Sequence, residues 1–161
     1  MNIDHEGDYV PSRPAQKPTV GYWIIAFILL LWGVGYVVLI AEAFFIMRPQ
    51  DFDRLVNAGM ILPGYDDYVQ HLPQWIVLLT LFKGFTRLAG AVALLLRRRW
   101  AVTLYSMSLL TSCLIFFRGF VLDSRATFEG PAQIGLDVVF FFLSVYAAYF
   151  AIAAHWRGIL R

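Results

Sequence analysis

The chain has 161 residues, of which 60% are hydrophobic and 15% are charged, and its formal net charge is +2. A soluble domain is closer to half apolar and a quarter charged, so this composition indicates a membrane protein. The net charge is too small to favour nucleic-acid binding. The one cysteine, Cys113, cannot form a disulfide within the chain.

The first twenty residues, Met1 to Val20, are polar and include three prolines. Acidic and basic side chains nearly cancel in this stretch, and proline opposes helix formation, so we predict a flexible tail over 1–20. The stretch lacks the short apolar run of a secretory signal peptide. The remainder, 21–161, is expected to form one transmembrane domain.

The first predicted membrane span is Gly21–Met47. About twenty apolar residues cross the hydrocarbon core of a bilayer, and this run is longer than that. Tyr22 and Trp23 mark its first interface with water, where aromatic side chains are enriched. Gly33 and Gly35 predict close approach of a neighbouring helix, because small residues let helix backbones meet.

A long connection, Arg48–Pro73, follows the first span. Pro49 and Asp51 are typical of a helix start, because proline fits the first turn and an acid favours the positive end of the helix dipole. Apolar residues then recur at helical spacing until Gly59 and the Pro63-Gly64 pair end the pattern. We therefore predict a short amphipathic helix at the membrane interface, followed by a turn.

Three further spans are predicted at Gln74–Leu96, Trp100–Val121 and Ile134–Trp156, and a short polar loop at Asp123–Gln133 separates the last two. Arg97-Arg98-Arg99 forms the hairpin between the second and third spans, because three arginines do not cross a bilayer easily. The sequence thus predicts an all-α fold. It is a four-transmembrane-helix bundle with a short interfacial helix in its first outer loop.

Arginines and lysines are distributed unequally between the two sides of this topology. The side with more of them is usually cytoplasmic. We therefore expect a multi-pass protein of the bacterial inner membrane with both termini in the cytoplasm. Seven basic residues lie on the side of the termini, namely Arg13, Lys17, Arg97, Arg98, Arg99, Arg157 and Arg161, and three on the other, namely Arg48, Arg54 and Arg125.

Five ionisable residues lie within the predicted spans: Glu42, Lys83, Arg87, Arg118 and Asp137. A single charge in the middle of a span costs about 3 kcal/mol on insertion scales, so we expect these residues to pair. Glu42, Arg118 and Asp137 each lie about 12 Å outward of the middle of their spans. Lys83 can extend to the same level. We predict that Glu42 pairs with Lys83 and that Asp137 pairs with Arg118.

Each predicted span carries small and polar residues on one face, since consecutive helical residues are 100° apart. We expect these faces to point inward and the apolar faces to contact lipid. The inward faces are Gly35 and Glu42; Thr80, Lys83, Gly84, Arg87, Gly90 and Ala91; Ser108, Thr111 and Arg118; and Asp137, Ser144, Ala148, Ala151 and His155.

After this pairing, Arg87 has no acidic partner left in any span, and its guanidinium stays charged. We predict that Arg87 lines a hydrated pocket, which a lipid phosphate, a carboxylate or an acidic side chain of a partner can enter. The alternative is that Arg87 donates to a carbonyl or to a hydroxyl such as Ser108 or Thr111 in a dry core. The whole charge cluster either fixes helix packing or forms a binding site.

Motifs of enzymes are not found: there is no phosphate-binding loop, no His-Glu-x-x-His and no nucleophile elbow. We therefore expect neither catalysis nor a cofactor. Asp66 and Asp67 lack a third ligand at a suitable spacing, so no metal site is predicted.

The sequence from Leu94 to Val102, LLLRRRWAV, resembles the hairpin of a mostly uncharacterised family of small four-helix bacterial membrane proteins. Some members carry the label "sugar transporter", and the resemblance covers Gly21 to about Phe117. The chain is also similar, more weakly, to DoxX-like four-helix proteins through Asn57-Ala58-Gly59 and its glycine-rich second span. That span has two cations and lacks the early acid typical of the DoxX-like family. Neither resemblance implies catalytic residues.

Two classes of function fit these features. The first is an accessory or structural subunit that packs against a larger membrane complex, and we favour it because a four-span chain without an internal repeat is small for alternating access. The alternative is binding or transport of a small polar or amphiphilic ligand, including an anionic one, through an outward-facing polar pocket. Expected partners are membrane lipid and either another protein or a second copy of the chain, but not nucleic acid.

Overall fold

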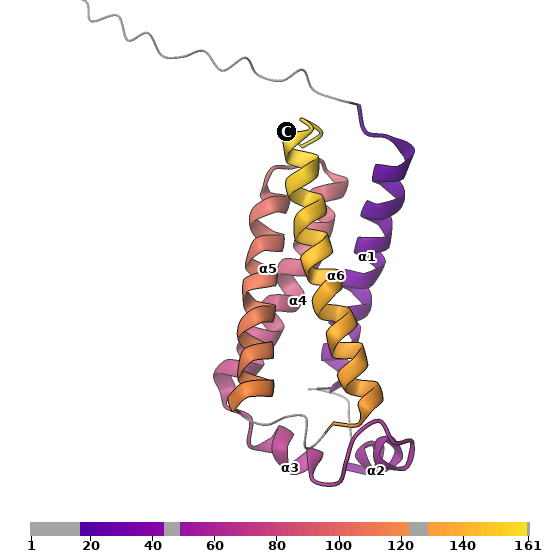
Figure 1. The fold of residues 1–161 in the computed structure, drawn as a ribbon, viewed down its shortest axis with the longest axis vertical. Coiled ribbons are helices and arrows are strands. Elements are labelled where there is room, and N and C mark those ends of the chain that lie inside the picture. The colour runs from indigo at the N-terminus through magenta and orange to yellow at the C-terminus, as the bar shows by residue number, and fades with distance from the viewer. Residues whose placement is uncertain (1–16, 44–48, 123–128, 161) are drawn as a thin grey trace, which may run out of the picture.

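The computed structural model describes residues 17–43, 49–122 and 129–160. These residues are largely helical, and four of the helices are long and apolar enough to cross a membrane. The four run side by side as a bundle, with the short helices α2 and α3 across one end and the C-terminal end of α6 at the other (Figure 1). The protein is therefore an all-α, multi-pass membrane protein built as a four-helix bundle.

The first span is α1 (Val20–Ala41), and it begins at the end of the predicted tail. Thr19 caps the helix, because its side chain accepts a hydrogen bond from the backbone N–H of Tyr22 at 3.3 Å. Glu42 and Ala43 continue the helix in a wider, π-type turn. The rest of the predicted span, 44–47, and the predicted tail over 1–16 lie outside the described residues.

The two glycines of α1 behave differently. A Cβ at Gly33 would lie 3.4 Å from the Leu88 backbone, so Gly33 allows close approach of the second span as predicted. Gly35 is exposed, and a Cβ there would meet nothing within 4 Å. The prediction that Gly35 faces inward is wrong, because the two positions are 200° apart on the helix and only one can face the bundle.

Two short helices lie across the end of the bundle opposite the arginine hairpin (Figure 1). The predicted interfacial helix is α2 (Pro49–Asn57), and a second helix, α3 (Tyr65–Gln70), was not predicted. Gly64 precedes α3 at φ 91°, a conformation that suits glycine. At six residues, α3 is too short for apolar periodicity to reveal it.

A backbone contact fastens this end to the last span. Ile61 and Glu129 form an isolated antiparallel bridge, and the Gly130 N–H donates to the Met60 carbonyl at 3.1 Å. A Cβ on Gly130 would lie 2.9 Å from the same Met60 oxygen, so this approach requires glycine. The segment that joins α2 to α3 is therefore anchored at the start of α6.

The other spans are α4 (Gln74–Leu95), α5 (Trp100–Phe117) with its π-helical extension η2 (Arg118–Leu122), and α6 (Pro131–Trp156). The observed bounds of α4 and α5–η2 agree with the predicted spans to within one residue. The last span begins at Pro131 rather than at Ile134, because proline fits the first turn of a helix. Residues 131–133 of the predicted polar loop therefore belong to the helix.

The half of the bundle near the arginine hairpin is packed more tightly than the half near α2 and α3. Backbones pack closely between α1 and α4, between α4 and α5, and between α5 and α6, whereas α1 and α6 meet in the described chain mainly through aromatic rings. Tyr22 stacks on Phe150 at 5.6 Å, and Tyr36 meets Phe140 edge-on at 6.5 Å. A core rich in alanine fills the half near the arginine hairpin, where the buried residues include Ala26, Ala91, Ala93, Ala101, Ala147, Ala148, Ala151 and Ala154.

Polar contacts close the bundle at the hairpin end. The Tyr22 hydroxyl donates to the Leu94 carbonyl at 2.6 Å, and Arg97 Nε donates to the Ile159 carbonyl at 3.1 Å. Gly158, at φ 70°, turns the chain so that Ile159 is buried against the bundle. These bonds tie α1, α4 and the chain after α6 together at one end, while the opposite end widens.

Candidate ligand-binding cavity

A cavity of about 440 Å³ lies in the wider half of the bundle, at the end covered by α2 and α3. Its volume is within the range of small-molecule pockets, about 300–1,000 Å³. All four spans and both short helices contribute to its walls. Aliphatic and aromatic side chains predominate, among them Leu39, Ile40, Phe52, Leu55, Met60, Leu72, Ile76, Ile115, Phe116, Leu136, Phe140 and Phe141.

Four of the five predicted charged residues line this one cavity: Glu42, Lys83, Arg118 and Asp137. They come from α1, α4, η2 and α6, so the shared level deduced from helix rise is reproduced in three dimensions. Two acids and two cations balance the formal charge of the wall. The specific pairing of Glu42 with Lys83 and of Asp137 with Arg118 stays a prediction.

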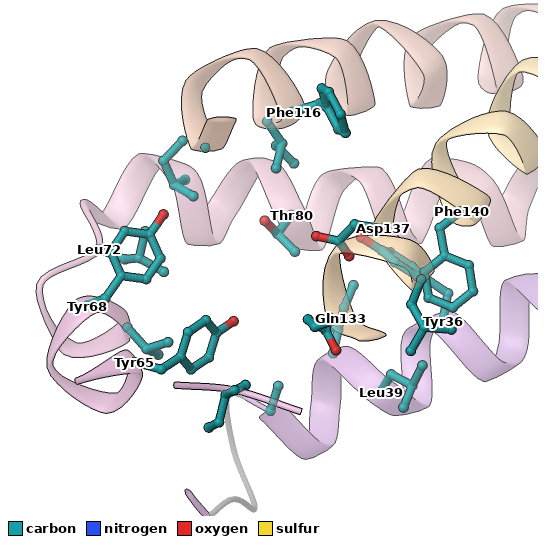
Figure 2. A pocket seen from close by; sticks show the side chains of 18 of the residues that line it. Tyr36, Leu39, Tyr65, Tyr68, Leu72, Thr80, Phe116, Gln133, Asp137 and Phe140 are labelled. Atoms are coloured by element: carbon teal, nitrogen blue, oxygen red, sulfur yellow. The ribbon is translucent and has the colours of Figure 1, made fainter. Parts of the chain in front are cut away.

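Polar uncharged groups enter the cavity from several elements. Figure 2 shows the side chains of Thr80, Gln133 and Asp137 and the hydroxyl of Tyr65 directed into the same space. Tyr36 and Phe140 lie together at the end of the cavity farthest from α3 (Figure 2). The cavity thus combines an apolar wall with a few convergent polar groups, as ligand sites generally do.

Wider helical turns place two of the charges. Glu42 and Arg118 each stand at the start of a π-type turn, where the helix departs from its regular 100° step. Such turns are rare and occur often at functional sites. The guanidinium of Arg118 also lies 4.7 Å from the ring centre of Trp75, a cation–π contact that holds the side chain beside α4. Spacing alone does not reveal these turns.

Lys83 and Arg87 occupy different environments although they are one helical turn apart. Lys83 lines the cavity, and its Nζ lies 5.0 Å from the ring centre of Tyr36. Arg87 is 0% exposed and is not part of the cavity wall. The prediction that Arg87 lines the pocket is wrong, because its side chain is buried between the helices on the side of the cavity that faces the arginine hairpin.

Arg87 is held by one hydroxyl and two aromatic rings. Its Nη2 donates to Ser144 Oγ at 2.6 Å, while that hydroxyl donates onward to the Phe140 carbonyl at 2.8 Å. The guanidinium carbon lies 3.8 Å from the ring centre of Trp32 and 4.2 Å from that of Tyr36. Arg87 therefore donates to a serine hydroxyl, as the alternative prediction stated, but this serine is Ser144 on α6 and not a residue of α5.

The predicted inward faces are otherwise largely buried. Gly84, Gly90 and Ala91 on α4, Ser108 and Thr111 on α5, and Ser144, Ala148 and Ala151 on α6 are all buried. His155 is exposed, so its predicted inward position is wrong: it lies on the last turn of α6, where the bundle ends. The aromatic residues of the site were not predicted from the sequence; they are Trp32, Tyr36, Tyr65 and Tyr68.

Comparisons add no family to this description: no protein-family model, curated protein or solved structure matches the chain. Among the described residues, no group of three histidine, cysteine or acidic side chains is arranged to hold a metal ion. What the cavity can bind is therefore inferred from the residues that line it.

Proposed function

We propose that this protein is a membrane receptor or carrier for a small amphiphilic ligand, rather than an enzyme. The observation that supports this most directly is the gathering of four intramembrane charges around one cavity with an otherwise apolar wall. Charges inside a membrane are costly and commonly mark binding sites or transport paths. A purely structural set of ion pairs needs no cavity between its members.

The composition of the wall indicates the kind of ligand. An apolar body fits among the leucine, isoleucine and phenylalanine side chains, where its burial contributes about 25 cal/mol per Å². A polar group at one end of the ligand can meet the cations, acids and hydroxyls of the site. An amphiphile satisfies both parts of the wall, whereas a sugar or an inorganic ion satisfies only the second.

We further propose that the cavity faces the outside of the bacterial inner membrane. Among the described basic residues outside the spans, Lys17, Arg97–Arg99 and Arg157 lie at the opposite end, and only Arg54 stands beside the cavity end in α2. An excess of basic residues marks the cytoplasmic side. Both termini would then be cytoplasmic, and a ligand would enter from the outer leaflet or from outside.

Purification at native expression level tests the proposed function. The protein is extracted with its surrounding lipid, and native mass spectrometry records any bound small molecule. Thr80→Phe fills the cavity and is expected to abolish the adduct, whereas Leu78→Phe makes the same kind of change on the lipid face of α4, where Leu78 is 65% exposed. An adduct that survives equally in both variants contradicts the proposed site.

The accessory-subunit role is favoured by one separate feature. Gly35 is exposed on the outer face of α1, and the space where its Cβ would lie is open. Such a position lets the helix of another membrane protein, or of a second copy, approach closely. The same purification distinguishes the two roles. A fixed protein partner and no small-molecule adduct support the accessory role, and a lone bundle with an adduct supports ligand binding.

A further inference from the structure

A second polar cluster surrounds the buried guanidinium of Arg87, on the side of the cavity that faces the arginine hairpin. Two of its nitrogens, Nε and Nη1, are buried and have no hydrogen-bond partner among the described residues. The same is true of Trp32 Nε1, the Tyr105 hydroxyl and the Ser108 hydroxyl. We call these four residues, Trp32, Arg87, Tyr105 and Ser108, the donor cluster.

The members of the donor cluster come from three spans, α1, α4 and α5, that pack around Arg87. Trp32 on α1 contacts the guanidinium directly at 3.8 Å. Tyr105 on α5 packs over Gly90, one turn along α4 from Arg87. Ser108 is buried one turn farther along the same helix as Tyr105.

The other buried serine and threonine hydroxyls of the described spans are satisfied within their own helices. Thr86, Thr111, Ser112 and Ser144 each donate to a carbonyl three or four residues earlier. Ser108 does not, although its position on α5 offers it the same possibility. The unsatisfied hydroxyls are therefore specific to the surroundings of Arg87 and not a general feature of these spans.

The chemistry of the donor cluster calls for a hydrogen-bond acceptor. Arginine and the tryptophan ring can only donate, so these two side chains cannot satisfy each other. Each unsatisfied polar group inside a membrane costs several kcal/mol, and a buried cation without a counter-ion costs more. The contacts that hold Arg87, one serine oxygen and two rings, contain no acid. An anionic group supplies the negative charge that all four residues lack and the lone pairs that Arg87 and Trp32 lack.

The side chain of Tyr36 belongs both to the cavity wall and to the surroundings of Arg87. The ring of Tyr36 lines the cavity and contacts both Lys83 Nζ at 5.0 Å and the Arg87 guanidinium at 4.2 Å. Ser112, one turn from Ser108 on α5, also lines the cavity. Tyr36 therefore lies at the boundary between the cavity and Arg87, and a ligand that reaches Arg87 from the cavity must displace its ring.

We infer that the donor cluster binds the anionic headgroup of the amphiphile whose apolar body occupies the cavity. This inference rests on the proposed function and adds the class of ligand, a single-chain amphiphile with one negatively charged group such as a carboxylate. The cavity wall is formally neutral, because it has two acids and two cations, and the neighbouring Arg87 adds one positive charge. One negative charge on the ligand balances the site.

A pair of probes with the same chain and bromine, one with a charged and one with a neutral headgroup, tests the inference on the unmodified protein. The probes are decanoic acid brominated at the carbon next to the carboxylate and the correspondingly brominated decanol. Bromine quenches tryptophan fluorescence at short range, so a headgroup at Arg87 is reported by Trp32. The Trp32→Phe variant shows which part of the quenching comes from this residue. We expect the ionised acid to bind about tenfold more tightly than the alcohol, equivalent to about 1.4 kcal/mol.

The outcomes separate the inference from the proposed function. If neither probe binds, the cavity is not an amphiphile site and both fail. If acid and alcohol bind equally, the proposed function survives and the anionic headgroup is ruled out. Inorganic phosphate is added as a competitor at constant ionic strength. Loss of the preference for the acid with phosphate identifies a site for free anions and overturns the assignment to an amphiphile.

Substitutions locate the preference at the donor cluster. Arg87→Gln is expected to remove the difference between the probes. Because that variant can fail to fold, Ser108→Ala serves as a milder change that removes one hydroxyl, and it should weaken binding of the acid several-fold without affecting the alcohol. Ser106→Ala is the matched control, since Ser106 is exposed two residues away on α5. Equal effects of the two serine substitutions contradict the inference.

Discussion

At the scale of single residues, the intramembrane charges divide into two groups that the sequence does not distinguish. Lys83 and Arg87 share one face of α4, yet Lys83 lines the cavity and Arg87 is buried one turn closer to the arginine hairpin. Spacing along a helix gives the direction of a side chain but not where a long, flexible side chain ends. The partners of Arg87, Trp32 and Ser144, belong to other helices, so its environment depends on how the bundle assembles.

A double substitution tests the predicted pair of Asp137 and Arg118. Removing one member of a buried ion pair costs about 3–5 kcal/mol in soluble proteins, because the other charge is left without compensation. Asp137→Ala should therefore lower the yield of folded protein, and adding Arg118→Ala should restore part of it. Size-exclusion chromatography and thermal unfolding in detergent measure the effect. A double variant no better than the single variant rules the pair out.

At the scale of elements, the sequence predicted the spans well because an apolar run of twenty residues has few alternative interpretations. Shorter features depend on tertiary contacts. The helix α3 and the π-type turns at Glu42 and Arg118 each involve only one or two turns, which leave no periodic signal. These are the elements that shape the cavity, so the site was less predictable than the fold around it.

The Gly130 contact offers a test of how the covering segment is held. Gly130→Ala places a Cβ against the Met60 carbonyl and should destabilise the protein by about 1–3 kcal/mol, as overpacking typically does. Gly135→Ala is the control on the same helix, because a Cβ there meets nothing within 4 Å. Alanine is the better helix former, so the control should be neutral or stabilising. Thermal unfolding measures both, and equal melting temperatures contradict the role of the contact.

At the scale of the whole molecule, the bundle is closed near the arginine hairpin and open near α2 and α3. The sequence contains a signal of this asymmetry that helical-face reasoning overlooks. The second half of α6 presents Ala147, Ala148, Ala151 and Ala154 to its neighbours, whereas its first half presents Phe140 and Phe141. Small residues let helices approach and large rings hold them apart, so the change along α6 matches the widening.

This asymmetry makes the orientation in the membrane functionally decisive, because it determines which side the cavity faces. In a Cys113→Ala background, Asp66→Cys lies in exposed α3 and Arg98→Cys lies in the exposed hairpin. Because basic residues are retained on the cytoplasmic side, a membrane-impermeant maleimide should label Asp66→Cys in intact cells and Arg98→Cys only after lysis. Labelling of the hairpin alone in intact cells would turn the cavity toward the cytoplasm, and a ligand would then have to come from inside the cell.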